Sequence, residues 1–186
     1  MAGIILVRHA PTAWTGSRFC GRSDPPLDAA GMAAAQRLAG ELATTLAPGT
    51  RIITSPLRRA YATATAVAKA AVIDDITIDD RWRENYFGIA EGLTFEELEH
   101  LAPDLARRLA DGESEIDWPD GESAADLTRR ITDAWADLVT AGAEVLVVSH
   151  AGPLRIAIGL ASGRTPGKVE LPAPGAVIRL PLSVLA

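Results

Sequence analysis

The sequence predicts an α/β fold, with a mostly parallel sheet between two layers of helices in a three-layer α/β/α sandwich. Two observations support this prediction. Short apolar runs rich in Ile and Val, typical of buried strands, alternate along the chain with longer Ala-rich or amphipathic stretches of helical length. The hydrophobic share of 48% and the charged share of 23% are normal for a globular protein and exclude disorder across the whole chain.

The length of the chain predicts a single domain over residues 1–186. No internal repeat, low-complexity tract or linker interrupts these 186 residues. The 18 Lys and Arg residues against 24 Asp and Glu residues give a net charge of −6. No nucleic-acid partner is expected, because nucleic-acid binders usually carry a basic face. A bound anion would need a local concentration of positive charge.

The single cysteine and the sequence of the amino terminus indicate the cellular compartment of the protein. Cys20 is the only cysteine, so a disulfide within the chain and a cysteine-based zinc site are both excluded. The apolar stretch at residues 4–7 is too short for a signal-peptide core or a membrane span, and Arg8 ends it. We therefore expect a cytoplasmic protein without a membrane partner.

The first half of the chain carries clear signals for strands and helix starts. Asp28 is a typical N-cap residue, and Ser55-Pro56 combines an N-cap residue with a proline suited to the first helical position. The expected elements are a buried strand over residues 3–7, a loop over 10–27, a helix from 28 to about 48, a strand over 51–54, a helix from 55 to about 72, and a weak edge strand over 76–78.

The pattern of strands and helices is less regular over residues 80–122 than in the rest of the chain. Residues 80–122 predict a small cap segment over the carboxyl end of the sheet, which is where we expect the functional site. Ser123 is a typical N-cap residue, and the run EVLVVS is the clearest buried strand in the chain. The expected elements are short helices over 95–101 and 103–110, a turn-rich stretch over 111–121, a helix over 123–141, a strand over 144–149, a helix to about 161, and a strand over 176–180.

Three of the predicted strands end in residues that can do chemistry. The first strand leads into Arg8-His9, the second into Ser55 through Arg59, and the fourth into Ser149-His150. Ligands bind at the carboxyl ends of strands in an open parallel sheet, so these residues should converge in one crevice. Arginine binds phosphate well because its planar fork donates two parallel hydrogen bonds. The residue types therefore predict an anion site, with phosphate as the favoured ligand.

These segments resemble the signature blocks of the histidine phosphatase superfamily, also called the phosphoglycerate mutase-like superfamily. Five blocks occur in the family order between residues 4 and 155, although alanine stands at Ala10 where the family usually has glycine. The blocks are Leu6-Val7-Arg8-His9-Ala10, Ser55-Pro56-Leu57-Arg58-Arg59-Ala60, Arg83-Glu84-Asn85-Tyr86-Phe87-Gly88, Trp118-Pro119-Asp120-Gly121-Glu122-Ser123 and Val147-Val148-Ser149-His150-Ala151-Gly152.

The resemblance implies a division of roles among five residues. His9 would attack phosphorus and form a phosphohistidine, and Glu84 would act as the acid that protonates the leaving oxygen. Arg8, Arg59 and His150 would bind the phosphoryl oxygens and stabilise charge in the transition state. No metal and no cofactor are needed in this scheme, because the arginines neutralise the charge. The substrate partner would be a small phosphomonoester.

The loop before the first helix and the residue after His150 supply further candidates for substrate binding. These candidates are Thr15, Arg18, Cys20, Gly21 and Ala151. The alternative for the loop is a purely structural one, in which Arg22 and Asp24 brace it. Thr15 stands where the mutase branch commonly has asparagine.

Several residues distinguish the phosphatase branch of the family from the mutase branch. Phe87 and Phe95 stand where glycolytic mutases have tyrosine and lysine, and the Gly-Glu-Ser segment favours a phosphatase that resembles α-ribazole phosphatase. The alternatives are mutase-type phosphoryl transfer and, from another class, a non-catalytic protein that binds a phosphorylated ligand. A homodimer is the candidate assembly.

Overall fold

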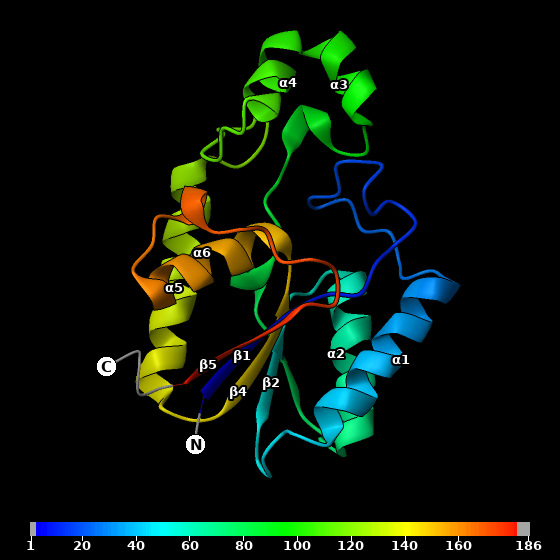
Figure 1. Ribbon diagram of the computed structural model, residues 1–186, viewed down its shortest axis with the longest axis vertical. Helices are drawn as coiled ribbons and strands as arrows, with labels where there is room; N and C mark the ends of the chain where they lie inside the picture. Colours follow the sequence, from blue (N-terminus) through cyan, green and yellow to red (C-terminus); the bar gives the residue numbers. More distant parts are fainter. Residues whose placement is uncertain (1–2, 182–186) are drawn as a thin grey trace.

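A computed structural model describes residues 3–181, which form a five-stranded sheet in the order β3-β2-β4-β1-β5 (Figure 1). β1, β2, β3 and β4 run parallel to one another, and β5 pairs antiparallel with β1 at one edge. The mostly parallel sheet and the edge position of β3 are confirmed. The strands are β1 (Gly3–Arg8), β2 (Arg51–Thr54), β3 (Ile76–Ile78), β4 (Val145–Ser149) and β5 (Val177–Pro181).

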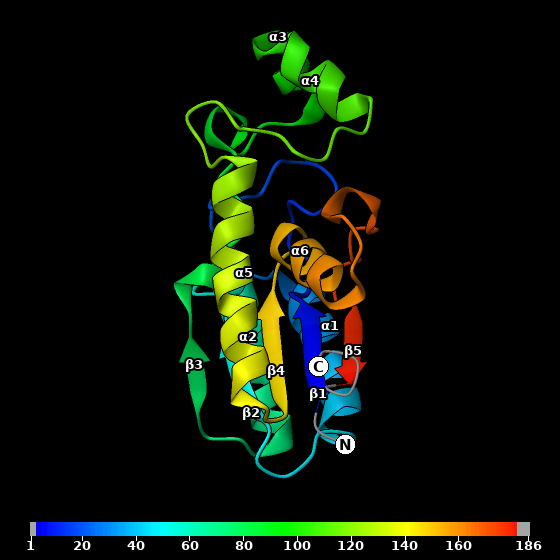
Figure 2. The same cartoon turned by 90° about the vertical axis from the view of Figure 1, so that its left-hand side faces the viewer.

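Helices cover both faces of the sheet, which confirms the three layers (Figures 1 and 2). α1 (Ala29–Ala43) and α2 (Arg58–Ala71) lie on one face, and α5 (Ala124–Ala141) and α6 (Ala151–Ser162) lie on the other. Side chains of β1 alternate between the two cores, because successive residues of a strand point to opposite faces. Ile5 and Val7 pack toward α1 and α2, whereas Ile4 and Leu6 pack toward α5 and α6.

Two of the three predicted helix caps are present. The side chain of Asp28 accepts a hydrogen bond from the amide of Gly31 at 2.7 Å, and Ser123 accepts one from the amide of Asp126 at 3.0 Å. The expected cap at Ser55 is wrong. α2 begins at Arg58 with Leu57 at its N-cap, because the Ser55 hydroxyl lies one turn earlier and has another partner, described below. The first helix also ends earlier than expected, at Ala43.

The middle of the chain projects beyond the carboxyl end of the sheet (Figures 1 and 2). Two short helices, α3 (Phe95–Leu101) and α4 (Pro103–Ala110), stand at its tip as the sequence predicts. The projecting part has its own core, made of Ala90, Leu98, Leu105, Ala106, Ile116 and Trp118. The start of the 80–122 segment belongs instead to the body of the fold, since Trp82 is fully buried in the core beneath α5. Three short 3-10 helices complete the fold, at Asp80–Trp82, Gly88–Ala90 and Pro166–Lys168.

Between residues 3 and 181, no helix combines the length and the apolar character that crossing a bilayer requires.

Candidate active site

The ends of β1, β2 and β4 meet at one place, as the strand pattern predicts. The amide of His9 donates to the carbonyl of Ser149, and the amide of Ser55 donates to the carbonyl of Val148, both at 3.0 Å. These bonds extend the parallel ladders by one residue beyond the strands. They fix the residues after the three strands in register, so that the two histidine rings lie with their centroids 5.0 Å apart.

The hydrogen bonds of His9 define which ring nitrogen is free to react. Nδ1 lies 2.7 Å from the carbonyl oxygen of Ala10, which can only accept a hydrogen, so Nδ1 carries the proton. Nε2 accepts a hydrogen bond from Nε of Arg59 at 3.2 Å. Burial and the Arg59 charge lower the pKa of His9 to about 3. The imidazole is therefore neutral at physiological pH, with the lone pair on Nε2.

His150 is fully buried, and its ring is fixed by Ser55. Nε2 of His150 lies 2.8 Å from Oγ of Ser55, and that hydroxyl already accepts from the amide of Leu57 at 3.2 Å. Because the hydroxyl proton of Ser55 has no other acceptor among residues 3–181, we assign it to Nε2, and the ring proton is then on Nδ1. Nδ1 is buried and has no hydrogen-bond partner among residues 3–181. Burial and the positive charge of Arg59 hold the pKa of His150 well below its usual value.

Arg59 is a fully buried cation that ties His9 to the loop before α1. Its guanidinium donates to the backbone carbonyls of Ser23 at 2.8 Å, Cys20 at 3.2 Å and Gly21 at 2.7 Å, besides Nε2 of His9. A buried charge is tolerated when its donors are satisfied. Arg59 therefore holds the loop closed and at the same time places positive charge beside the reactive nitrogen.

Arg8 presents a donor that the protein does not use. Its Nη1 donates to the carbonyl of Pro172 at 2.6 Å, whereas its buried Nε has no hydrogen-bond partner in the described part of the chain. Buried polar groups are nearly always paired, so each exception calls for an explanation. Nε of Arg8 and Nδ1 of His150 are two such exceptions beside His9, and both can donate to an anion.

Glu84 is a buried carboxyl group at the same site. Its Oε1 accepts from the amide of Asn85 at 2.9 Å, and the amide of Gly152 lies 3.2 Å from Oε1 and 3.4 Å from Oε2. A Cβ atom at position 152 would stand 2.6 Å from Oε1, so a larger residue there would displace the Glu84 carboxyl group. Burial raises the pKa of Glu84, although the Asn85 amide and nearby arginines oppose the shift. A raised pKa suits a carboxyl group that donates a proton near neutral pH.

A half-buried ion pair holds the backbone of the Glu84 segment. Arg130 on α5 donates to both carboxylate oxygens of Glu122, at 2.6 and 2.8 Å. The same guanidinium donates to the carbonyls of Arg81 at 2.5 Å, Arg83 at 2.8 Å and Glu84 at 3.2 Å. Arg130 thus fixes three carbonyls around Glu84 relative to α5.

The remaining candidates surround this centre but differ in what their side chains do. Thr15, Arg18, Cys20 and Ala151 line a cavity of about 180 Å³, which Arg8, His9 and Glu84 also line. The Thr15 hydroxyl accepts from the amide of Thr12, and the Arg18 guanidinium binds the carbonyl of Gly92 and the carboxylate of Glu97.

Gly21 and Cys20 shape the loop of the site. A Cβ atom at Gly21 would stand 2.2 Å from Oε1 of Glu91, and that carboxylate accepts from the amides of Arg22 and Ser23 at 2.8 Å. Glycine is therefore needed where the loop meets Glu91. Burial raises the pKa of Cys20, so its thiol is protonated at neutral pH.

Within residues 3–181, no group of three or more His, Cys, Asp and Glu side chains is arranged to hold a metal ion. Two histidines, two arginines and one protonatable carboxyl group instead form the polar part of the site.

The family assignment follows from a family model that spans nearly the whole chain. The histidine phosphatase superfamily (branch 1) model matches residues 4–178. The chain belongs to this superfamily. The resemblance of the five sequence blocks is thereby confirmed, and the shared fold accounts for the convergence of the strand ends.

Known relatives of this histidine phosphatase include phosphatases and mutases. It is 37% identical over 161 residues to the bifunctional protein Rv2228c of Mycobacterium tuberculosis, covering 85% of this chain but only 43% of that relative. It is 37% identical over 153 residues to the probable phosphoglycerate mutase GpmB of Salmonella arizonae, covering 81% of this chain and 70% of the relative. The mycobacterial glucosyl-3-phosphoglycerate phosphatase Rv2419c superposes with a TM-score of 0.84 at 25% identity, covering 96% and 90% of the two chains.

The sequence did not reveal every residue that builds the site of this histidine phosphatase. Ser55 was expected to cap a helix, whereas it fixes the ring of His150. Arg130 gave no signal, because it resembles any other charge on an amphipathic helix. Glu122 belongs to a quoted block, but its contact with Arg130 depends on α5 packing beside the Glu84 segment.

Proposed function

We propose that this histidine phosphatase is a metal-independent phosphomonoester hydrolase that acts through a phosphohistidine on His9. The state of His9 carries the proposal. Its Nδ1 is protonated and bound to the Ala10 carbonyl, its pKa is held at about 3, and its Nε2 lies beside the cationic side chain of Arg59 in a buried site. A neutral imidazole with a directed lone pair is what nucleophilic attack on phosphorus requires.

In the first step, Nε2 of His9 forms a bond to phosphorus as the bond from phosphorus to the ester oxygen breaks. The proton stays on Nδ1, in its hydrogen bond to the Ala10 carbonyl, so the imidazole becomes a phosphorylated cation. Glu84 in its protonated form gives its proton to the departing oxygen, which leaves as an alcohol. General acid help of this kind contributes roughly 10²–10⁴-fold.

In the second step, a water molecule attacks the phosphorus of phosphohistidine. The Glu84 carboxylate takes a proton from that water, inorganic phosphate leaves, and His9 returns to its neutral form. Arg8 Nε and His150 Nδ1, two unpaired buried donors, bind the phosphoryl oxygens in both steps. Nε of Arg59 exchanges its hydrogen bond with Nε2 of His9 for one with a phosphoryl oxygen, which frees the lone pair of Nε2 for attack. Each preorganised donor of this kind is worth about 3 kcal/mol in the transition state.

The physiological substrate is proposed to be a small phosphorylated metabolite. α-Ribazole phosphate is the candidate that the loop Gly-Arg-Ser-Asp-Pro-Pro-Leu favours by resemblance. The segment that projects above the sheet is proposed to act as the cap that encloses the substrate, with the chain functioning as a single domain in the cytoplasm. The proposed homodimer stays a prediction.

Mutase-type transfer is the second candidate function. The match to the probable phosphoglycerate mutase GpmB supports it, since the two chains share 37% identity. It predicts exchange between 2- and 3-phosphoglycerate that depends on 2,3-bisphosphoglycerate and outpaces hydrolysis. Hydrolysis faster than exchange would favour the phosphatase, and absence of both would leave a protein that only binds phosphorylated ligands.

The test of the proposal is hydrolysis of p-nitrophenyl phosphate by the purified chain in excess EDTA. We expect turnover that EDTA does not reduce and that His9→Ala abolishes. His100→Ala, on the exposed face of α3, is the matched control and should retain turnover. Activity that survives in His9→Ala, or that EDTA removes, would contradict the proposal.

A further inference from the structure

A second, larger cavity adjoins the phosphate site and is not accounted for by phosphate chemistry. Its volume is about 670 Å³, against about 180 Å³ for the cavity that holds His9 and Arg8. Glu84, Phe87 and Ala151 line both cavities, so the proposed acid stands at their junction. Because Glu84 protonates the ester oxygen in the proposed reaction, the organic group attached to that oxygen extends into the larger cavity.

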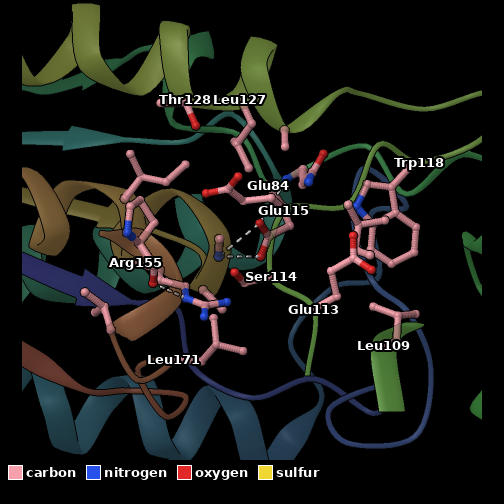
Figure 3. Close-up of a pocket in the computed structure, with 18 of the residues that line it drawn as sticks. Glu84, Leu109, Glu113, Ser114, Glu115, Trp118, Leu127, Thr128, Arg155 and Leu171 are labelled. Atoms are coloured by element: carbon pink, nitrogen blue, oxygen red, sulfur yellow. Dashed lines mark hydrogen bonds between the residues drawn. The ribbon is translucent and has the colours of Figure 1, made fainter. Parts of the chain in front are cut away.

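The walls of this cavity combine an apolar part with charged side chains. Phe87 and Trp118 are packed with their ring centroids 4.5 Å apart, and aliphatic side chains complete the apolar part of the lining (Figure 3). These aliphatic residues are Leu109, Ile116, Leu127, Ile156, Val169 and Leu171. Pockets of this size and composition bind ring systems by burying apolar surface.

Arg155 is the only cationic side chain that lines the cavity among residues 3–181, and two of its five N–H donors are bound to backbone carbonyls. Its Nε donates to the carbonyl of Pro166 at 2.6 Å, and its Nη2 donates to the carbonyl of Gly167 at 3.0 Å. Figure 3 shows Arg155 at the edge of the cavity, next to Leu171. A carboxylate or a second phosphate on the substrate would therefore meet no cation with a full set of free donors.

Besides Glu84, three glutamates line the same cavity. Glu113 is bound by the guanidinium of Arg108 through two hydrogen bonds. Glu115 and Glu170 are exposed and make no ion pair within the described residues. Their negative charge disfavours a second anionic group on the substrate and favours a neutral or cationic one.

We infer that the larger cavity selects phosphomonoesters whose organic part is a bulky ring system that is neutral or positively charged. This inference rests on the proposed hydrolase function and names its substrate class. It places ring-bearing esters ahead of small acidic ones such as phosphoglycerates. Glu115 and Glu170 are the residues that determine the charge selection.

A matched series of aryl phosphates tests the inference. We would measure kcat/KM for 4-methylphenyl, 4-(aminomethyl)phenyl and 4-carboxyphenyl phosphate, together with phenyl and 1-naphthyl phosphate. The naphthyl ester should exceed the phenyl ester by about tenfold or more, as expected for added apolar contact in a pocket. Among the three 4-substituted esters, the carboxyphenyl ester should have the lowest kcat/KM. This order would not reflect leaving-group ability, because its phenol is not the poorest leaving group of the three.

The variant Glu115→Gln/Glu170→Gln isolates the charge effect. It should raise kcat/KM for the carboxyphenyl ester relative to the methylphenyl ester by about tenfold, whereas Glu99→Gln on the exposed face of α3 should leave that ratio unchanged. Equal or better cleavage of the carboxyphenyl ester by the wild type would overturn the substrate class while leaving the hydrolase function intact. A ratio that the double variant does not change would overturn the role of the two carboxylates. Absence of hydrolysis of every ester would overturn the proposed function itself.

Discussion

Oγ of Ser55 lies 2.8 Å from Nε2 of His150, across 95 positions of the chain. This contact fixes the ring so that Nδ1 carries the proton and can donate to phosphate. Ser55→Ala removes the hydroxyl and leaves Nε2 buried without a partner, at a cost of about 1–3 kcal/mol. We expect kcat/KM for p-nitrophenyl phosphate to fall roughly 5- to 150-fold.

The control for this variant is Ser162→Ala, at the exposed end of α6, which should keep the wild-type rate. Nitrogen NMR of labelled histidine would show whether Ser55→Ala changes the tautomer of His150. If Ser55→Ala changes neither the tautomer of His150 nor the rate, Ser55 has no positioning role.

Glu84 should determine the alkaline side of the pH profile. Burial raises its pKa, so the proton that it must donate is present below that raised value and is lost as the pH rises through it. An alkyl phosphate needs this proton because its alkoxide leaves poorly, whereas p-nitrophenolate leaves without it. We expect Glu84→Gln to lower kcat/KM for glycerol 2-phosphate by roughly 10²–10⁴-fold and to affect p-nitrophenyl phosphate far less. Equal losses for both substrates would contradict the assignment of Glu84 as the acid.

The low pKa of His9 should make the fold sensitive to acid. Its pKa is lowered from 6.5 to about 3 on folding, so the unfolded chain binds the proton first as the pH falls. Stability from this group is complete above pH 6.5 and declines toward pH 3. Between pH 7 and pH 4 the loss amounts to about 3 kcal/mol.

Urea unfolding of the wild type and of His9→Gln at these pH values tests this prediction. The free energy of unfolding of the variant should fall less between pH 7 and pH 4 than that of the wild type. His100→Gln controls for loss of an exposed histidine. Parallel curves for wild type and His9→Gln would contradict the prediction.

Arg130 should act through Glu84 rather than on the substrate. Lysine at this position keeps the charge but lacks the fork that binds Glu122 and three carbonyls at once. We expect Arg130→Lys to lower kcat for an alkyl phosphate with little change in KM, and to lower the free energy of unfolding by about 1–3 kcal/mol. Arg129→Lys, whose partner is the exposed Asp126, is the matched control. A change confined to KM would indicate a contact with substrate instead.

The sequence revealed the fold and the centre of the site because those signals are local. Buried strands that end in Arg8-His9 and Ser149-His150 can be read from a few adjacent residues, and the parallel sheet then brings them together. The role of Ser55 could not be predicted from Ser55-Pro56, because the same dipeptide starts a helix in other sequences. Here the Ser55 hydroxyl is hydrogen-bonded to His150, which is distant in the sequence. The contacts of Arg130 and the mostly acidic charge of the larger cavity depend on packing between segments, which no short pattern encodes.

The net charge of −6 is compatible with an anion site because the positive charge is concentrated locally. Arg8 and Arg59 lie beside two neutral histidines, while carboxylates such as Glu115 and Glu170 line the neighbouring cavity. Local charge in a cleft determines which ligands it attracts more than the total does. The phosphate end and the organic end of the substrate are therefore expected to meet opposite electrostatic environments.

Trapping the phosphorylated enzyme tests the central claim most directly. The purified chain would be mixed with p-nitrophenyl phosphate in excess EDTA, quenched in alkali to preserve phosphohistidine, and analysed by mass spectrometry of its peptides. We predict one added phosphoryl group on the peptide that contains His9, acid-labile, and absent in His9→Gln. Turnover without any phosphorylated peptide, or a phosphoryl group on another residue, would contradict the account.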